Sequence, residues 1–168
     1  MGFAFFPPSE RFQELYDEVW QQGHAFIRSH EGVPILEKFL SRLAHRQVIF
    51  VREEYHRIWE HILSRRSAAI DAGDMEQEGL TINGQPGIGK SLFLYYALGA
   101  ALLARIPVVL CKHEQFCYTF DTTGFKRFWF NRGEPLDLPD HTLFLVDCNW
   151  DLSSPPPLLL ERSGVLVL

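Results

Sequence analysis

Residues 82–96 read INGQPGIGKSLFLYY, a polar, glycine-rich turn that passes directly into an apolar stretch. By average residue usage, a chain of 168 residues contains the pattern G-x-x-x-x-G-K-[ST] by chance at roughly the per-cent level or below. The competing interpretation is a flexible turn that only joins a strand to a helix. The apolar segment before the turn and the helical pattern after it favour a functional loop. The eight matching positions are Gly84, Gln85, Pro86, Gly87, Ile88, Gly89, Lys90 and Ser91.

The residue types in this turn suit the binding of phosphate groups. Glycines allow the backbone angles at which several N–H groups converge on one point. A helix that begins near Lys90 directs the positive end of its dipole to the same place. The Lys90 ammonium can reach the β- and γ-phosphates, and the Ser91 hydroxyl is a hard oxygen ligand for Mg²⁺. The turn therefore predicts a phosphate-binding loop (P-loop), residues 84–91, that holds ATP or GTP with Mg²⁺.

A single acid at the end of an apolar run supports this prediction. Residues 143–147 read LFLVD, so Asp147 directly follows a buried-strand pattern. P-loop sites need a carboxylate at the end of a neighbouring strand to hold the Mg²⁺ shell. Taken alone, Asp147 would be an ordinary acid at a strand end. Beside the P-loop, we predict that Lys90 and Asp147 are catalytic and that Ser91 and Asp147 form the metal site.

The pattern on either side of the loop predicts an α/β fold. A polar break at residues 71–79 separates a helical N-terminal region (1–72) from a P-loop core (79–168). Apolar residues before the break recur at helical spacing after Ser9, after Pro34 and from Tyr55 to Ile70. The predicted fold is a three-layer P-loop NTPase core with a mostly parallel sheet. Beyond the break we expect strands near 79–83, 107–111, 142–147 and 164–168, a helix at 91–104 and a hairpin insertion near 115–130.

Four segments together carry a family resemblance. NGQPGIGKSLFLYYAL, IPVVL, FCYTFDTTG and LFLVD resemble the P-loop ATPase module of Crinkler and retrotransposon-hot-spot-like proteins, over about residues 79–168. The resemblance implies a nucleotide-hydrolysing module that is often fused to a nuclease-like domain. The expected partners are therefore a nucleoside triphosphate and, in a longer protein, a second copy of the chain or a fused effector domain.

Hydrolysis needs a group that orients the attacking water, commonly a Glu beside the metal-site Asp. Here Cys148 follows Asp147, and the nearest polar candidates are Asn149, Asp151 and Glu161. A charge-stabilising arginine often comes from later in the chain or from a neighbouring subunit. The sequence does not select among the available ones, which are Arg127, Arg132 and Arg162.

The last residues of the sequence also bear on whether the chain can hydrolyse a nucleotide. In the additional-strand class of P-loop ATPases, a polar sensor residue lies at the end of the strand after the metal-site Asp. Residues 164–168, GVLVL, have the pattern of that strand, and the sequence stops at Leu168 before such a residue. We therefore expect a C-terminally shortened chain, in which the motifs support nucleotide binding more directly than turnover.

Two other functions fit parts of the pattern. A nucleotide or small-molecule kinase uses the same loop, but it usually carries an arginine-bearing lid and an acceptor pocket, and neither is evident. A non-hydrolysing binding or interaction module is favoured by the absence of a Glu after Asp147. The intact Lys90–Ser91 pair argues against a fully degenerate loop.

Composition excludes several classes of function. The formal charge is −5 and the pI is about 5.8, so the chain has no general attraction to nucleic acid. Three cysteines form no disulfide framework, and no signal peptide is recognisable, so we expect an intracellular location. The apolar stretch 91–110 is interrupted by Arg105 and Pro107, and we expect a buried helix and strand there rather than a membrane span.

Two smaller signals have structural interpretations. Cys111, His113, Cys117 and Cys148 lack the paired C-x₂-C spacing of structural zinc sites, and we expect them to be strand residues. Neither Cys111 nor Cys117 is predicted to be a nucleophile. The aromatic residues of segment 116–130 could stack a base, and a hairpin packed into the core is the favoured interpretation.

Overall fold

The computed structural model describes residues 9–20, 51–73, 78–132, 135–148, 152–160 and 164–167. Helices and strands are mixed along the chain, as predicted for an α/β fold. The predicted helix after Pro34 lies outside the described residues. The elements are α1 (Ser9–Leu15), the π-helical turn η1 (Tyr16–Trp20), α4 (Glu53–Ala72), β1 (Glu78–Leu80), α5 (Lys90–Leu103), β2 (Val108–Cys111), β3 (Phe116–Asp121), β4 (Gly124–Trp129), the 3₁₀ turn η2 (Phe130–Arg132), β5 (Thr142–Val146), α6 (Pro157–Leu160) and β6 (Gly164–Val167).

The strands form one six-stranded sheet in the order β1-β6-β5-β2-β3-β4. The pairings β1–β6, β6–β5 and β5–β2 are parallel, whereas β2–β3 and β3–β4 are antiparallel. The sheet is therefore mixed, and the prediction of a mostly parallel sheet is wrong. The physical reason is that the aromatic hairpin extends the sheet through β2 instead of standing apart as an insertion.

The individual strands lie where the sequence predicted them. Each of the four expected strands overlaps a strand of the sheet, and the two aromatic runs form the hairpin β3–β4. Residues of β2 and β5 alternate between two apolar clusters, because successive side chains of a strand point to opposite faces. Val108 and Leu110 belong to one cluster, and Val109 and Cys111 belong to the other. Burial on both faces explains why these strands are apolar at every position except Thr142, the first residue of β5.

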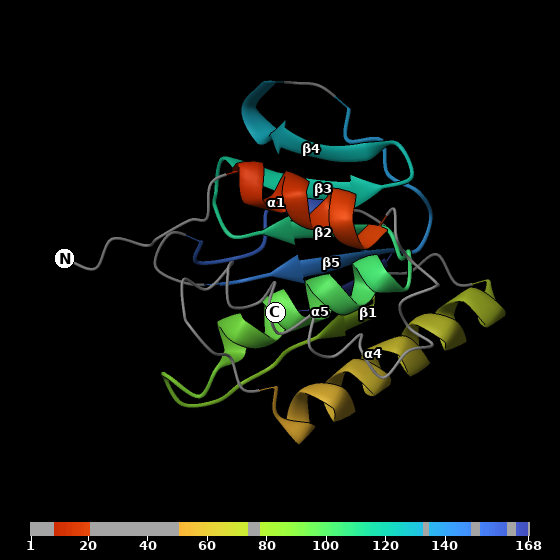
Figure 1. Ribbon diagram of the computed structural model, residues 1–168, viewed down its shortest axis with the longest axis vertical. Helices are drawn as coiled ribbons and strands as arrows, with labels where there is room; N and C mark the ends of the chain where they lie inside the picture. The colour runs from red at the N-terminus through yellow and green to blue at the C-terminus, as the bar shows by residue number, and fades with distance from the viewer. Residues whose placement is uncertain are drawn as a thin grey trace.

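The helices α1, α4 and α5 contribute to the same apolar cluster, on one face of the sheet. Figure 1 shows α1 and α5 side by side in front of the strands, with α4 next to α5. On the other face, the described residues that cover the sheet include Leu136, Leu152 and, from the short α6, Leu159. α5 carries no polar face over its middle turns because it lies between the sheet and α4.

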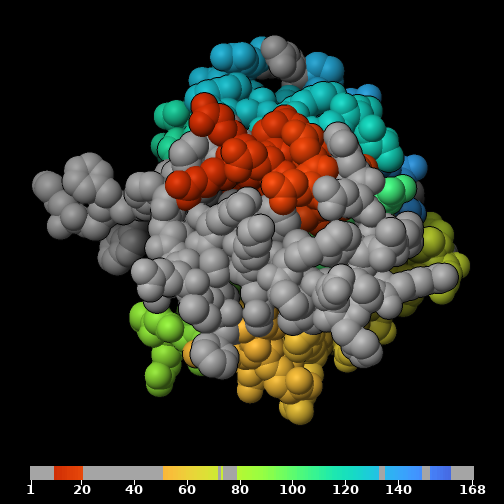
Figure 2. All heavy atoms as spheres, viewed as in Figure 1, coloured from red at the N-terminus to blue at the C-terminus, as the bar shows by residue number. Residues whose placement is uncertain are grey.

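The N-terminal segment 9–20 packs on the hairpin. The Phe12 ring lies 4.7 Å from the ring of Tyr118 and 6.0 Å from that of Phe120, centroid to centroid. The Tyr16 hydroxyl donates a hydrogen bond of 2.8 Å to the carbonyl of Asp121. Figure 2 shows this segment (red) directly against the hairpin residues (teal). The division of the chain into a helical region and a P-loop core stays a prediction.

The apolar stretch 91–110 forms a buried helix and a buried strand, as predicted. α5 ends at Leu103, and β2 begins at Val108 after Pro107. Within the described ranges, no helix combines the length and the apolar character that a membrane span requires.

Candidate functional site

The predicted P-loop connects the end of β1 to the start of α5. Gly87 and Gly89 have φ angles of +81° and +102°, in the left-handed region that favours glycine. A Cβ at Gly84 would lie 3.2 Å from Cγ2 of Ile88, which is a tight contact. The loop backbone therefore needs glycine for its angles at two positions and for its close approach at a third.

Lys90 is the first residue of α5, and its ammonium folds back on the loop. Nζ donates hydrogen bonds of 2.7 Å to the carbonyl of Gly84 and 3.2 Å to that of Gln85. The backbone N–H of Phe93 donates to the carbonyl of Gly89 at 2.9 Å, as the first bond of the helix. The amide groups of Lys90, Ser91 and Leu92, the first three residues of α5, have no partner within the helix and can donate to a ligand.

The structure brings Ser91 and Asp147 together across 56 positions of sequence. The Ser91 hydroxyl donates to Oδ1 of Asp147 at 3.3 Å. Asp147 directly follows β5, and its backbone N–H donates to the carbonyl of Cys111 at 2.9 Å. This hydrogen bond fixes the position of the backbone that carries the Asp147 carboxylate. The result is a pair of hard oxygen donors beside the start of α5.

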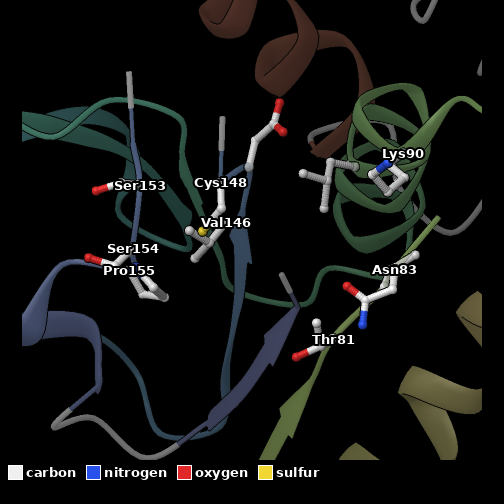
Figure 3. A pocket seen from close by; sticks show the side chains of 11 residues that line it. Thr81, Asn83, Lys90, Val146, Cys148, Ser153, Ser154 and Pro155 are labelled. Atoms are coloured by element: carbon white, nitrogen blue, oxygen red, sulfur yellow. The ribbon is translucent and has the colours of Figure 1, made fainter. Parts of the chain in front are cut away.

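A pocket of about 330 Å³ opens at this point. Figure 3 shows Lys90 on one side, the loop 153–155 on the opposite side, and Val146 and Cys148 between them. Thr81 and Asn83 lie below Lys90 in the same view. The remaining lining residues are Ile82, Leu94 and Asp147.

Lys112 is a charged residue of the site that the sequence analysis did not identify. Its Nζ lies 3.4 Å from Oδ2 of Asp147, and both side chains are only 12% exposed. The same Nζ donates a hydrogen bond of 2.7 Å to the Tyr95 hydroxyl, from α5. A usable signal existed, because Lys112 directly follows the apolar run VVLC as Asp147 follows TLFLV. Carboxyl ends of parallel neighbouring strands meet at one edge of a sheet.

Helix α4 and the residue before it contact the predicted P-loop through two hydrogen bonds. The buried Tyr55 donates from its hydroxyl to the carbonyl of Gly89 at 2.9 Å. Arg52, just before the helix, donates from Nη1 to the carbonyl of Ile88 at 3.1 Å. Burial raises the pKa of the Tyr55 phenol, so the hydroxyl stays a donor at neutral pH. No local pattern in the sequence indicated these contacts, because 34 positions separate Tyr55 from Gly89.

Replacing Tyr55 by phenylalanine is expected to loosen the loop. Loss of one neutral hydrogen bond lowers the free energy of unfolding by about 0.5–1.5 kcal/mol, and amide hydrogen exchange in residues 84–89 should become faster. Tyr96→Phe is the matched control, since the Tyr96 hydroxyl pairs with Nδ1 of His56 at 2.9 Å and not with a carbonyl of the loop. Equal acceleration of loop exchange in both variants would contradict a specific role for Tyr55.

The candidate arginines that the structure describes lie elsewhere. The Arg127 guanidinium is 5.2 Å from the ring centroid of Phe116, and that of Arg132 is 5.5 Å from the ring centroid of Trp129. Both belong to the hairpin side of the sheet, and neither lines the pocket. The remaining candidates for water orientation or charge stabilisation lie outside the described residues; they are Asn149, Asp151, Glu161 and Arg162.

The cysteines have the properties of structural residues. Burial raises the pKa of Cys111 to about 12 and raises that of Cys117 further. Cys148 is exposed and lines the pocket, and its pKa is raised by partial burial and by the nearby Asp147 charge. All three thiols are therefore protonated at neutral pH. In the part of the chain that the structure describes, no three His, Cys, Asp or Glu side chains gather as a metal site.

Comparisons with protein families, curated proteins and solved structures find no match to this chain.

Proposed function

We propose that this chain binds a purine nucleoside triphosphate, ATP or GTP, together with Mg²⁺, and hydrolyses it to the diphosphate and phosphate. The observation that carries the proposal is the bond between Ser91 and Asp147, next to a pocket that Lys90 and Asp147 both line. A glycine turn that only joins a strand to a helix has no need for a carboxylate from another strand next to its Lys-Ser pair.

Each group of the loop has a defined role in this proposal. The backbone N–H groups of the loop and of the first turn of α5 hold phosphate oxygens. An ammonium has three N–H donors, so the two bonds from Lys90 to loop carbonyls leave a third for a phosphate oxygen. Lys90 stabilises negative charge on the β- and γ-phosphates, and the pocket accommodates the rest of the nucleotide.

The oxygen donors fit a magnesium ion of the P-loop type. Mg²⁺ takes one or two protein oxygens and completes its shell with water and substrate phosphates. Ser91 would supply the direct ligand, and Asp147 would orient the water shell. Bound Mg²⁺ would neutralise charge that develops between the β- and γ-phosphates. The absence of a three-residue acid or histidine cluster within the described ranges is compatible with such a site.

The order of the strands supports the same class of fold. β6 lies between β1 and β5, so a strand separates the strand before the P-loop from the one that carries Asp147. This is the position expected for the additional strand of P-loop ATPases, and we propose a P-loop NTPase core similar to that of Crinkler-like ATPases. A third layer would lie over the face that Leu136, Leu152 and α6 cover.

A non-hydrolysing nucleotide-binding module is the second candidate, and one observation favours it. Cys148 occupies the position after Asp147 where a water-orienting Glu commonly stands, and its thiol is protonated at neutral pH. Among the described pocket residues, Asp147 is the only carboxylate, and it is already engaged by Ser91 and Lys112. Such a module would bind the triphosphate as a switch for a partner or a fused domain.

Calorimetric titration with ATP, ADP and adenosine in Mg²⁺ tests the proposal. A loop that holds phosphates predicts binding of ATP and ADP with micromolar affinity and little or no binding of adenosine. Repeating the titration with GTP gives the base preference. Equal affinity for adenosine and ATP, or no heat and no thermal protection with either triphosphate, would overturn the proposed binding.

Phosphate release separates the two candidate functions once binding is established. Steady release from bound ATP supports the hydrolase, whereas binding without release supports the switch module. Transfer of the phosphoryl group to an added acceptor instead would identify a kinase.

A further inference from the structure

Lys112 directly follows β2, as Asp147 directly follows β5. The two strands are parallel, with Cys111 opposite Val146 in the register. The residues that follow these two strand ends are therefore Lys112 and Asp147, at the same edge of the sheet. The backbone bond from the N–H of Asp147 to the carbonyl of Cys111 keeps the two strand ends in register at this point.

The Lys112 ammonium is fixed by three contacts. It lies 3.4 Å from Oδ2 of Asp147, 2.7 Å from the Tyr95 hydroxyl oxygen and 4.5 Å from the centroid of the Tyr95 ring. Its side chain is 12% exposed, so most of its water shell has been replaced by these groups. A surface lysine that only happened to approach an acid would keep most of its hydration.

Asp147 is consequently shared between two donors. Oδ1 accepts from the Ser91 hydroxyl at 3.3 Å, and Oδ2 faces Lys112. The Lys112 charge neutralises the one carboxylate among the described pocket residues. Without the Lys112 charge, Asp147 would attract a divalent cation more strongly. It would also repel a triphosphate that arrives without a bound cation.

We propose that Lys112 is a resident cation of the metal site, which pairs with Asp147, competes with Mg²⁺ for that carboxylate and makes triphosphate binding less dependent on Mg²⁺. This inference rests on the proposed function and names a regulator of the same site. Lys112 acts through Asp147 and through the electrostatic potential of the pocket, and it is a positioning residue. The chemistry of nucleotide hydrolysis does not itself require it.

The metal dependence of binding is the quantity that tests this role. It is measured as the ratio of the ATP dissociation constant in EDTA to that in saturating Mg²⁺. In Lys112→Met we expect affinity in EDTA to fall, the Mg²⁺ concentration for half-maximal binding to decrease, and the ratio to rise about tenfold. In general, two unit charges about 6 Å apart at an effective dielectric constant of about 40 interact with a free energy of that order.

Three variants make the experiment specific. Lys112→Arg keeps the charge and should keep the ratio within about threefold of the native value. Lys126→Met removes an exposed lysine of β4, whose Nζ bonds to Oγ1 of Thr123, and should change nothing. Lys112→Gln removes the charge but can still bond to Asp147, so it replaces the Met variant if that variant unfolds, and it should raise the ratio similarly.

Manganese binding gives a readout that does not depend on turnover. In the presence of ADP, Mn²⁺ followed by electron paramagnetic resonance should bind Lys112→Met or Lys112→Gln more tightly than the native chain. An unchanged ratio and unchanged Mn²⁺ affinity in folded Lys112→Met or Lys112→Gln would overturn this inference while native ATP binding stands. No ATP binding by the native chain, with or without metal, would overturn the proposed function itself.

Discussion

Replacement of Lys90 by alanine is expected to weaken binding of Mg-ATP by about 100-fold. The variant loses the only lysine ammonium that lines the described pocket, and a hydrogen bond to a charged group contributes about 1.5–3 kcal/mol. Each 1.4 kcal/mol is a factor of about ten in the dissociation constant. The measurement is calorimetric titration of native and variant chains with ATP at fixed Mg²⁺.

Lys126→Ala is the matched control, because it removes an equal charge from the exposed surface of the hairpin. We expect this variant to keep native affinity. The Lys90 variant also loses two bonds to loop carbonyls, so folding of both variants should be compared by thermal denaturation. A folded Lys90→Ala chain that binds Mg-ATP as tightly as the control would contradict the role of Lys90 in the phosphate loop.

Local pattern accounts for the part of the site that the sequence could predict. The residue types of 84–91 are dictated by a turn and a helix start that are contiguous in sequence, so the loop was recognisable without any tertiary information. Asp147 was recognisable because it ends a run of buried β-branched and apolar residues. β2 and β5 were predictable for the same reason, since burial on both faces leaves an almost uninterrupted apolar run. The hairpin was predictable because two aromatic-rich runs flank the turn sequence DTTG, residues 121–124.

The features of the fold and the site that were not predicted depend on contacts between segments that are distant in sequence. The loop contact from Tyr55 and the ion pair of Lys112 join positions 34 and 35 residues apart, respectively, and neither pair forms a motif. The mixed sheet was missed because two strands joined by a short turn predict a hairpin but do not indicate whether that hairpin stands alone or pairs with another strand. Ile70 was placed on the apolar face of its helix by spacing, yet it is 39% exposed near the end of α4.

Gly89→Ala is expected to be the most damaging single change within the P-loop. An alanine at φ +102° costs about 1–2 kcal/mol in backbone energy. Its Cβ would also lie 2.5 Å from the Tyr55 hydroxyl oxygen, and overpacking of this kind costs about 1–3 kcal/mol more. We therefore expect the free energy of unfolding to fall by about 2–5 kcal/mol. We also expect the affinity for ATP to fall, because the first amide groups of α5 would change their orientation. Urea denaturation and calorimetry measure the two effects.

Gly87→Ala separates the two causes. Gly87 has a similar φ of +81°, but a Cβ there would meet no heavy atom within 4 Å. The substitution at Gly87 should therefore cost only the backbone term, about 1–2 kcal/mol. If both substitutions destabilise the chain equally, the packing of Tyr55 against Gly89 has no energetic role.

The same reasoning predicts that Tyr55→Phe partly relieves the destabilisation caused by Gly89→Ala. In a Tyr55→Phe background the nearest Tyr55-derived atom to the new Cβ is Cζ at 3.7 Å, which is an ordinary van der Waals contact. Gly89→Ala in that background should then cost about as much as Gly87→Ala, although the single Tyr55→Phe change is itself destabilising. A double variant in which the two losses simply add would show that the clash is relieved elsewhere. A double variant that is more stable than the sum of the two losses predicts would establish that α4 sets the position of the loop 84–91 through the Tyr55 hydroxyl group.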